Sequence, residues 1–194
     1  MPDETPTASQ PIATPQQLEQ ATQGRIKQSN PYAEQALASA SKTVRNLCGW
    51  HIAPKVTEAL RVDGRGGTIL QLPTLHLIGI GSLTETGSAL TPDVDFEWSE
   101  NGVLERHPGW SRRRRGIIAT VEHGWELDQV PEVVDLVCTL AARGLVAAKV
   151  AGAVREQAGT NSVQYGTAGG VAISIDVLDH EVAKLRPYIV PGRS

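Results

Sequence analysis

Four consecutive arginines are the strongest charge feature of the 194-residue sequence. The run consists of Arg112, Arg113, Arg114 and Arg115. Guanidinium groups bind carboxylates and phosphates through paired hydrogen bonds. The run is therefore compatible with three roles: a solvated loop, a contact with a neighbouring protein subunit, or a contact with nucleic acid. In the third role, the nearby Trp110 would stack on a base.

Three carboxylates alternate with apolar residues just before this run. Asp93, Asp95 and Glu97 would share one face of a strand, where three oxygen donors could hold a hard cation such as Ca²⁺ or Mg²⁺. The alternating apolar residues would then take the opposite, buried face; they are Val94, Phe96 and Trp98. A half-exposed strand needs polar side chains on its solvent face. We therefore expect these acids to be solvated and to bind no metal.

The remaining candidates for catalysis are weak. Gly79-Ile80-Gly81 begins like a dinucleotide-binding fingerprint, but Thr84 stands where the third glycine belongs. A lysine-bearing phosphate loop, a serine nucleophile elbow and a zinc-protease helix are all missing from the sequence. Glu122 and His123 are adjacent, so on a strand they would face opposite sides. We expect no enzymatic activity and no cofactor.

Composition narrows the protein classes further. The formal net charge of -3 argues against a protein whose whole surface binds nucleic acid. The first residues have neither the basic start nor the apolar core of a signal peptide, so we expect a soluble, non-exported chain. Cys48 and Cys138 lie in apolar patterns rather than at metal or redox spacing, which indicates buried thiols.

Start and stop signals outline the elements that would position these residues. Thr14 and Pro15, Asn30-Pro31, Pro131 and Asp176 are typical of helix starts. Short β-branched or alternating runs separated by turn residues predict strands between the second and third helices. The predicted segments are a flexible tail over 1–13, helices over 15–24, 31–47, 131–153 and 176–187, a β-rich insertion over 51–125, a polar loop over 159–172, and a tail over 191–194.

This order predicts an α+β fold that is mainly helical. We expect a small bundle of about four helices, with a β-hairpin region inserted between the second and third helices. Residues 14–190 would form a single domain.

Several short segments occur in an order that resembles a known family. They are Leu47-Cys48-Gly49-Trp50, Asp95-Phe96-Glu97-Trp98, Asn101-Gly102-Val103-Leu104, Val121-Glu122-His123-Gly124-Trp125, Leu140-Ala141-Ala142-Arg143 after Pro131, and Ser162-Val163-Gln164-Tyr165-Gly166. Together with the closing helix, they resemble the head-to-tail adaptor family of long-tailed bacteriophages, also called head-tail connector or head completion proteins. The resemblance covers roughly residues 12–190.

The resemblance implies a structural virion protein at the head-tail interface, assembled in the host cytoplasm. Such proteins form a ring, usually twelve-fold, beneath the portal vertex, and the ring extends the DNA channel. The implied partners are the portal protein, the next neck or stopper protein, further copies of the chain, and genomic DNA that passes without sequence specificity; no membrane is implied. Another neck component, such as a stopper or tail-completion protein, is the nearest alternative. A nucleic-acid-binding protein that uses the arginine run is a second.

Two surfaces are candidate sites within this interpretation. The four arginines would contact a neighbouring subunit or the DNA in the channel. An apolar stripe near the C-terminus would pack on a neighbouring chain or on the portal; it consists of Leu178, Val182, Leu185 and Tyr188. Truncation before Ser174 would then abolish portal binding and leave the monomer folded.

Overall fold

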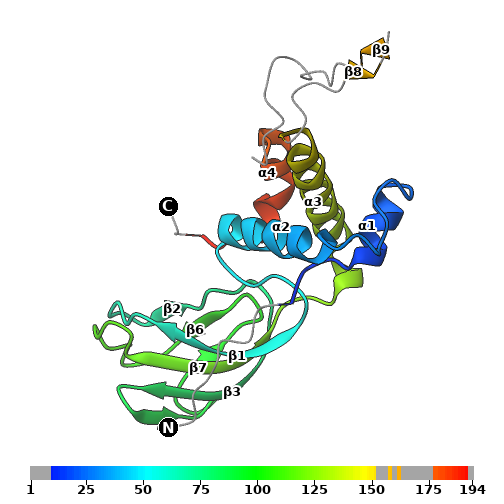
Figure 1. Ribbon diagram of the computed structural model, residues 1–194. Helices are drawn as coiled ribbons and strands as arrows, with labels where there is room; N and C mark the ends of the chain where they lie inside the picture. Colours follow the sequence, from blue (N-terminus) through cyan, green and yellow to red (C-terminus); the bar gives the residue numbers. More distant parts are fainter. Residues whose placement is uncertain (1–9, 152–156, 159–160, 163–176, 192–194) are drawn as a thin grey trace. The chain divides into compact units, whose positions relative to one another are not determined.

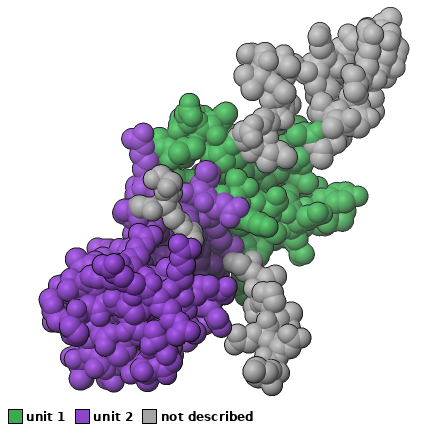
Figure 2. All heavy atoms as spheres, turned by 90° about the vertical axis from the view of Figure 1, so that its left-hand side faces the viewer, with its two compact units in different colours: residues 1–44, 131–185 green, residues 45–130, 186–194 purple. Residues whose placement is uncertain are grey.

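The computed structural model describes residues 10–151, 157–158, 161–162 and 177–191 (Figure 1). The chain divides into two compact units, coloured separately in Figure 2. We call residues 1–44 and 131–185 the helical unit, and residues 45–130 and 186–194 the β unit. Each unit therefore combines segments that are far apart in the sequence. The range 14–190, expected to be one domain, takes in parts of both.

Four α-helices account for the helical unit. They are α1 (Pro15–Ala21), α2 (Ala33–Cys48), α3 (Pro131–Ala151) and α4 (Asp179–Leu185), and the last residues of α2 belong to the β unit. Thr14 caps α1 through a capping box with Gln17, and Pro15 takes the first helical position. Residues 152–153 and 176, expected at helix ends, lie outside the described residues.

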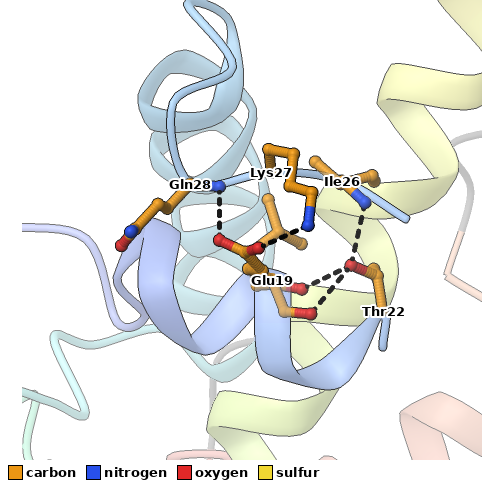
Figure 3. Close-up of polar contacts among 6 residues, drawn as sticks. Glu19, Thr22, Ile26, Lys27 and Gln28 are labelled. Carbon is orange, nitrogen blue, oxygen red and sulfur yellow. Dashed lines mark hydrogen bonds and ion pairs between the residues drawn. The ribbon is translucent and has the colours of Figure 1, made fainter. Parts of the chain in front are cut away.

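The segment that follows α1 is fastened back onto that helix (Figure 3). Glu19 accepts a hydrogen bond from the backbone N–H of Gln28 at 2.9 Å and pairs with Lys27 Nζ at 3.1 Å. The Thr22 hydroxyl donates to the carbonyl of Leu18 at 2.8 Å and accepts from the N–H of Ile26 at 3.2 Å. These bonds hold residues 26–28 against the C-terminal end of α1.

One face of α2 supplies part of the core of the helical unit. Its buried residues recur at helical spacing and are Ala33, Leu37, Ala40, Ser41 and Val44. The Ser41 hydroxyl donates to the Leu37 carbonyl at 2.7 Å and accepts from the N–H of Ile12 at 2.9 Å, which ties the segment before α1 to α2. Along α3, the buried residues are Val133, Val134, Leu136, Val137, Cys138, Leu140 and Ala141.

Two antiparallel sheets make up the β unit. The four-stranded sheet has the order β1-β7-β3-β4, with β1 (Val56–Val62), β7 (Ile117–His123), β3 (Leu77–Glu85) and β4 (Ser88–Leu90). The three-stranded sheet has the order β2-β6-β5, with β2 (Ile69–Gln71), β6 (Val103–Glu105) and β5 (Glu97–Trp98). A separate antiparallel pair joins β8 (Gln157–Ala158) to β9 (Asn161–Ser162). β8 lies just before the polar loop expected over 159–172, and β9 lies within that range.

The expected mainly helical bundle is therefore wrong. The insertion between α2 and α3 is a folded β unit with an apolar core of its own, not a hairpin carried by a bundle. That core is formed by Leu70, Leu72, Leu77, Leu83, Phe96, Leu104, Trp110, Ile117, Ala119 and Val121. Three alternate residues of β7, Ile117, Ala119 and Val121, belong to it, as period-2 alternation requires. Among the described residues, no helix has both the length and the apolar character needed to cross a membrane.

Candidate functional site: an arginine-rich surface on the β unit

The four consecutive arginines lie on the loop that joins β6 to β7. All four side chains are exposed, and none of them forms an ion pair with the described part of the chain. Arg65, on the loop that follows β1, is also exposed. We call these five side chains the arginine surface: Arg65, Arg112, Arg113, Arg114 and Arg115. The structure therefore presents these guanidinium groups to solvent.

The two loops that carry the arginine surface are joined through their backbones. Val62 pairs with Ile117 in the β1–β7 ladder, so the loop after β1 and the loop before β7 leave the sheet at the same end. The N–H of Gly64 donates to the Arg113 carbonyl at 2.9 Å, and the N–H of Arg115 donates to Asp63 Oδ1 at 2.7 Å. The arginines are thus held on a fixed backbone.

Gly64 allows this close approach. A Cβ at this position would lie 2.1 Å from the Ser111 carbonyl oxygen, which no real side chain tolerates. The sequence places Gly64 in a glycine-rich turn between two strand runs. In the structure, β1 pairs with β7 and β2 pairs with β6. Gly64 therefore allows two loops that are distant in sequence to contact each other, and does not form a tight turn between paired strands.

A buried carboxylate anchors the base of the arginine loop. Glu85, at the end of β3, accepts the N–H of Ser111 at 2.7 Å and also pairs with the guanidinium of Arg106. Thr86 donates its N–H to the Gly116 carbonyl at 2.7 Å, on the other side of the arginines. Arg106 is thus neutralised within the chain, in contrast to the four arginines that follow it.

The structure rules out the base-stacking role considered for Trp110. Its side chain is 4% exposed and belongs to the core of the β unit. The ring lies 6.0 Å from the ring of Phe96 and beneath the guanidinium of Arg106, and its Nε1–H donates to the Thr68 carbonyl at 3.0 Å. A ring with both its apolar surface and its N–H satisfied inside the fold has no face left for a nucleobase.

The acidic segment before β5 differs from the expected alternating strand. Val94, expected to be buried, is 79% exposed, whereas Phe96 is buried. Residues 91–96 form a tight turn in which the N–H of Asp93 donates to the Phe96 carbonyl and that of Asp95 to the Thr91 carbonyl, so strand geometry begins only at Glu97. Among the described residues, no group of acidic, histidine or cysteine side chains could hold a metal ion.

A polar cluster around the buried His123 connects β1, β7 and the segment after α2, and sequence patterns did not reveal it. His123 Nε2 lies 2.9 Å from Glu58 Oε1, and the ring of His51 lies 5.8 Å from that of His123. Burial lowers the pKa of His51 to about 4, helped by the positive charge of Arg45. The hydrogen bond from His123 holds the pKa of Glu58 below its usual value. Glu122 faces the other side of the strand and pairs with Lys55 at 3.4 Å.

An aromatic cluster surrounds Trp125 in the same unit. His76 stacks on its ring at 4.8 Å, and the rings of Trp50 and Tyr188 meet it edge-on at 5.1 and 5.3 Å. Trp50 Nε1–H also donates to the Tyr188 carbonyl at 2.7 Å. Tyr188, expected to pack on a neighbouring chain or the portal, therefore contacts aromatic residues of its own chain.

The other members of the expected C-terminal stripe differ in exposure. Leu178 is 44% exposed and Val182 is partly buried, whereas Leu185 is 1% exposed. Within the helical unit, Arg143 of α3 forms a two-point ion pair with Glu181 of α4, at 2.6 and 3.3 Å. Only Leu178 is thus well exposed toward a partner. Ser174 lies outside the described residues.

Comparison with solved structures gives a distant match. No protein-family model matches the chain, and no curated protein matches it. It is similar to a chain of a solved structure described as the neck of a native GTA particle computed with C12 symmetry. The sequence identity is 11%, the match covers 76% of this chain and 83% of that chain, and the TM-score is 0.46. At this identity and score, the likeness carries no functional argument for this chain.

Proposed function

We propose that this chain is a structural virion protein that joins the DNA-filled head of a long-tailed bacteriophage to its neck and tail. Copies of the chain form a ring, twelve-fold in the form implied by the family, beneath the portal vertex, and the ring extends the DNA channel. Its partners are the portal protein, the next neck or stopper protein and the passing genomic DNA. It has no catalytic role.

The observation that carries this proposal is the arginine surface. Five exposed guanidinium groups stand on two loops whose backbones are bonded together, without ion-pair partners in the described part of the chain. A protein whose partners are other subunits and a phosphate backbone needs such groups, because guanidinium binds both carboxylate and phosphate. The formal net charge of -3 keeps the rest of the surface from adhering to DNA.

One of the segments that resemble the adaptor family, Val121-Glu122-His123-Gly124-Trp125, lies in the β unit. His123 and Trp125 pack inside the β unit, and Gly124 between them has a φ of +96°. A Cβ on Gly124 would lie 3.0 Å from the Ile52 carbonyl oxygen, so glycine suits this turn in both respects. A motif built for packing is in keeping with an assembly protein.

Mass measurement of the purified chain, alone and mixed with its portal, tests the proposal. We expect a ring, or an oligomer that forms only with portal. A monodisperse monomer that ignores portal would contradict it. Gold-labelled antibody on purified particles provides a second readout, and label should appear at the head-tail junction.

A nucleic-acid-binding protein remains the second candidate, favoured only by the arginine surface. Burial of Trp110 removes the stacking platform considered for it, so phosphate contacts alone would supply affinity. Its signature would be a duplex-DNA mobility shift by the isolated monomer that weakens steeply between about 50 and 200 mM salt.

A further inference from the structure

We infer that the arginine surface of one copy docks on an acidic groove in the β unit of a second copy, forming a head-to-tail contact. The inference rests on the proposed ring and names the two surfaces that meet in it. The acidic groove has a volume of about 310 Å³ and is lined by Asp93, Val94, Asp95, Phe96, Glu97, Glu105 and His107. It thus carries four carboxylates.

Strand pairing in the groove brings two like charges together. Glu97 of β5 and Glu105 of β6 are directly opposite each other in the antiparallel register, and both side chains are exposed. Like charges in this position destabilise a sheet. His107 Nε2 lies 3.5 Å from Glu105 Oε1 but is itself largely exposed and counters the charge only when protonated. A cation from outside the chain would relieve this repulsion.

The two surfaces do not neutralise each other within one copy. No ion pair among the described residues joins an arginine of the arginine surface to an acid of the groove. Arg106, between Glu105 and the arginine run in sequence, is held by Glu85. The arginine loop is instead bonded to the loop after β1, because the Gly64 N–H donates to the Arg113 carbonyl and the Arg115 N–H donates to the Asp63 carboxylate.

A second copy of the chain satisfies both surfaces at once. A head-to-tail contact joins two different patches, which is the geometry that closes rings. Guanidinium groups pair with carboxylates through two parallel hydrogen bonds, so the arginines fit the acids in chemistry as well as in charge. A phosphate backbone would satisfy the arginines alone and would be repelled by the carboxylates of the same unit.

Paired charge reversals test this contact in the full chain. Arg113→Glu/Arg114→Glu lowers the formal charge of the arginine surface from +5 to +1, and Glu97→Lys/Glu105→Lys cancels the four negative charges of the groove. Each variant alone should self-associate at least ~100-fold more weakly than the wild type at low salt, because most of the charge attraction is lost. An equimolar mixture should regain association, since each variant now offers the surface that the other needs. Sedimentation velocity measures both effects.

Matched controls reverse the same number of charges elsewhere. Arg25→Glu/Lys42→Glu and Glu34→Lys/Glu100→Lys alter exposed residues outside both surfaces and should associate like the wild type. A wild-type chain that stays monomeric at low salt, reversals that associate normally, or a mixture that fails to regain association would overturn the inference. Loss of binding to duplex DNA with unchanged self-association would also overturn it, in favour of phosphate contacts.

Cysteine cross-linking tests proximity without reversing the charge of either surface. An Arg114→Cys chain mixed with a Glu97→Cys chain should form a disulfide-linked heterodimer, whereas an Arg114→Cys chain mixed with a Lys42→Cys chain should not. The native Cys48 and Cys138 are buried and do not compete. Absence of the first cross-link would overturn the inference even if a charge-reversal variant failed to fold.

Particle labelling separates this inference from the proposed function. If label appears at the head-tail junction, but the mixed charge-reversal variants do not associate and no cross-link forms, the docking alone is overturned. If no label appears on particles, but the mixed variants associate and the cross-link forms, the virion role is overturned and the docking is supported.

Discussion

His123 Nε2 lies 2.9 Å from Glu58 Oε1, and this contact links β7 to β1 from the inside of the β unit. The His123 side chain is 1% exposed, whereas that of Glu58 is partly open to solvent. Because a carboxylate only accepts, the Nε2–H donates. His123 Nδ1 is buried and has no hydrogen-bond partner in the described part of the chain.

Replacement of His123 should destabilise the β unit. His123→Ala removes a buried ring and leaves a cavity beside Trp50, so we expect a loss of about 2–4 kcal/mol in the free energy of unfolding. Urea denaturation followed by tryptophan fluorescence measures it, because all four tryptophans belong to the β unit. Glu122→Ala, one residue away and partly solvated, is the control, with an expected loss below about 1 kcal/mol. Equal losses would contradict the assigned contact.

Stability should fall in mild acid because of His51. Its pKa is about 4 in the folded chain and about 6.5 when unfolded, so the unfolded chain binds more protons between these values. The stabilising contribution is complete above pH 6.5 and is lost as the pH falls toward 4, by about 1–2 kcal/mol after allowing for partial exposure of the ring.

His51→Gln should flatten this pH dependence. Urea midpoints at pH 7 and pH 4.5 would then differ less than in the wild type. The lowered pKa of Glu58 should leave a further loss at lower pH in the variant, as that carboxylate becomes protonated in the folded chain. Parallel pH profiles for the variant and the wild type would contradict the role of His51.

Gly64 should tolerate no side chain. A Cβ would meet the Ser111 carbonyl oxygen at 2.1 Å, so Gly64→Ala must separate the two loops that carry the arginine surface. We expect a loss above about 2 kcal/mol by tryptophan fluorescence in urea. Gly79→Ala is the matched control, because a Cβ there meets nothing within 4 Å and its effect should be below about 1 kcal/mol. Comparable effects at the two glycines would argue against the loop contact.

Glu181 should matter to the helical unit alone. Burial raises the pKa of its carboxyl, but the bonds from Arg143 and from the Leu178 N–H outweigh this effect and leave the pKa below its usual value. Glu181→Ala removes the two-point ion pair with Arg143, so a loss of about 2–4 kcal/mol is expected. Circular dichroism at a helical wavelength should record it, with tryptophan fluorescence little changed and the exposed His180→Ala as control.

The two thiols should be unreactive in the native chain. Burial raises the pKa of Cys48 to about 12 and that of Cys138 to about 11, so neither supplies thiolate near neutral pH. A thiol reagent at pH 8 should label neither in buffer and both in denaturant. Rapid labelling in buffer would show that one of these positions opens readily.

Local signals predicted the starts of α1 and α3, whereas strand pairing over long range could not be predicted from the sequence. Pro15 and Pro131 begin α1 and α3 because proline suits a first helical turn wherever it occurs. β1 pairs with β7, more than fifty residues away, and not with β2, which follows it in the chain and pairs with β6. Strand partners depend on which apolar faces meet, and no short window of sequence contains that information.

The candidate site was likewise predictable only in the features that local composition decides. A run of four charged side chains could hardly be buried, so the exposure of Arg112 to Arg115 followed from composition. The position of Trp110 did not, because the carbonyl of Thr68 that satisfies its indole lies forty-two residues earlier. The cluster of His51, Glu58 and His123 left no pattern, since three separate segments contribute one residue each.

The interleaving of the two units has a consequence for biosynthesis. The β unit is completed by bonds from Trp50 Nε1 to the Tyr188 carbonyl and from the Val190 N–H to the Cys48 carbonyl. On a translating ribosome, strands β1 to β7 emerge long before these residues do. The β unit can therefore reach its final state only after residue 190 has cleared the exit tunnel, whereas its strands are available to pair earlier.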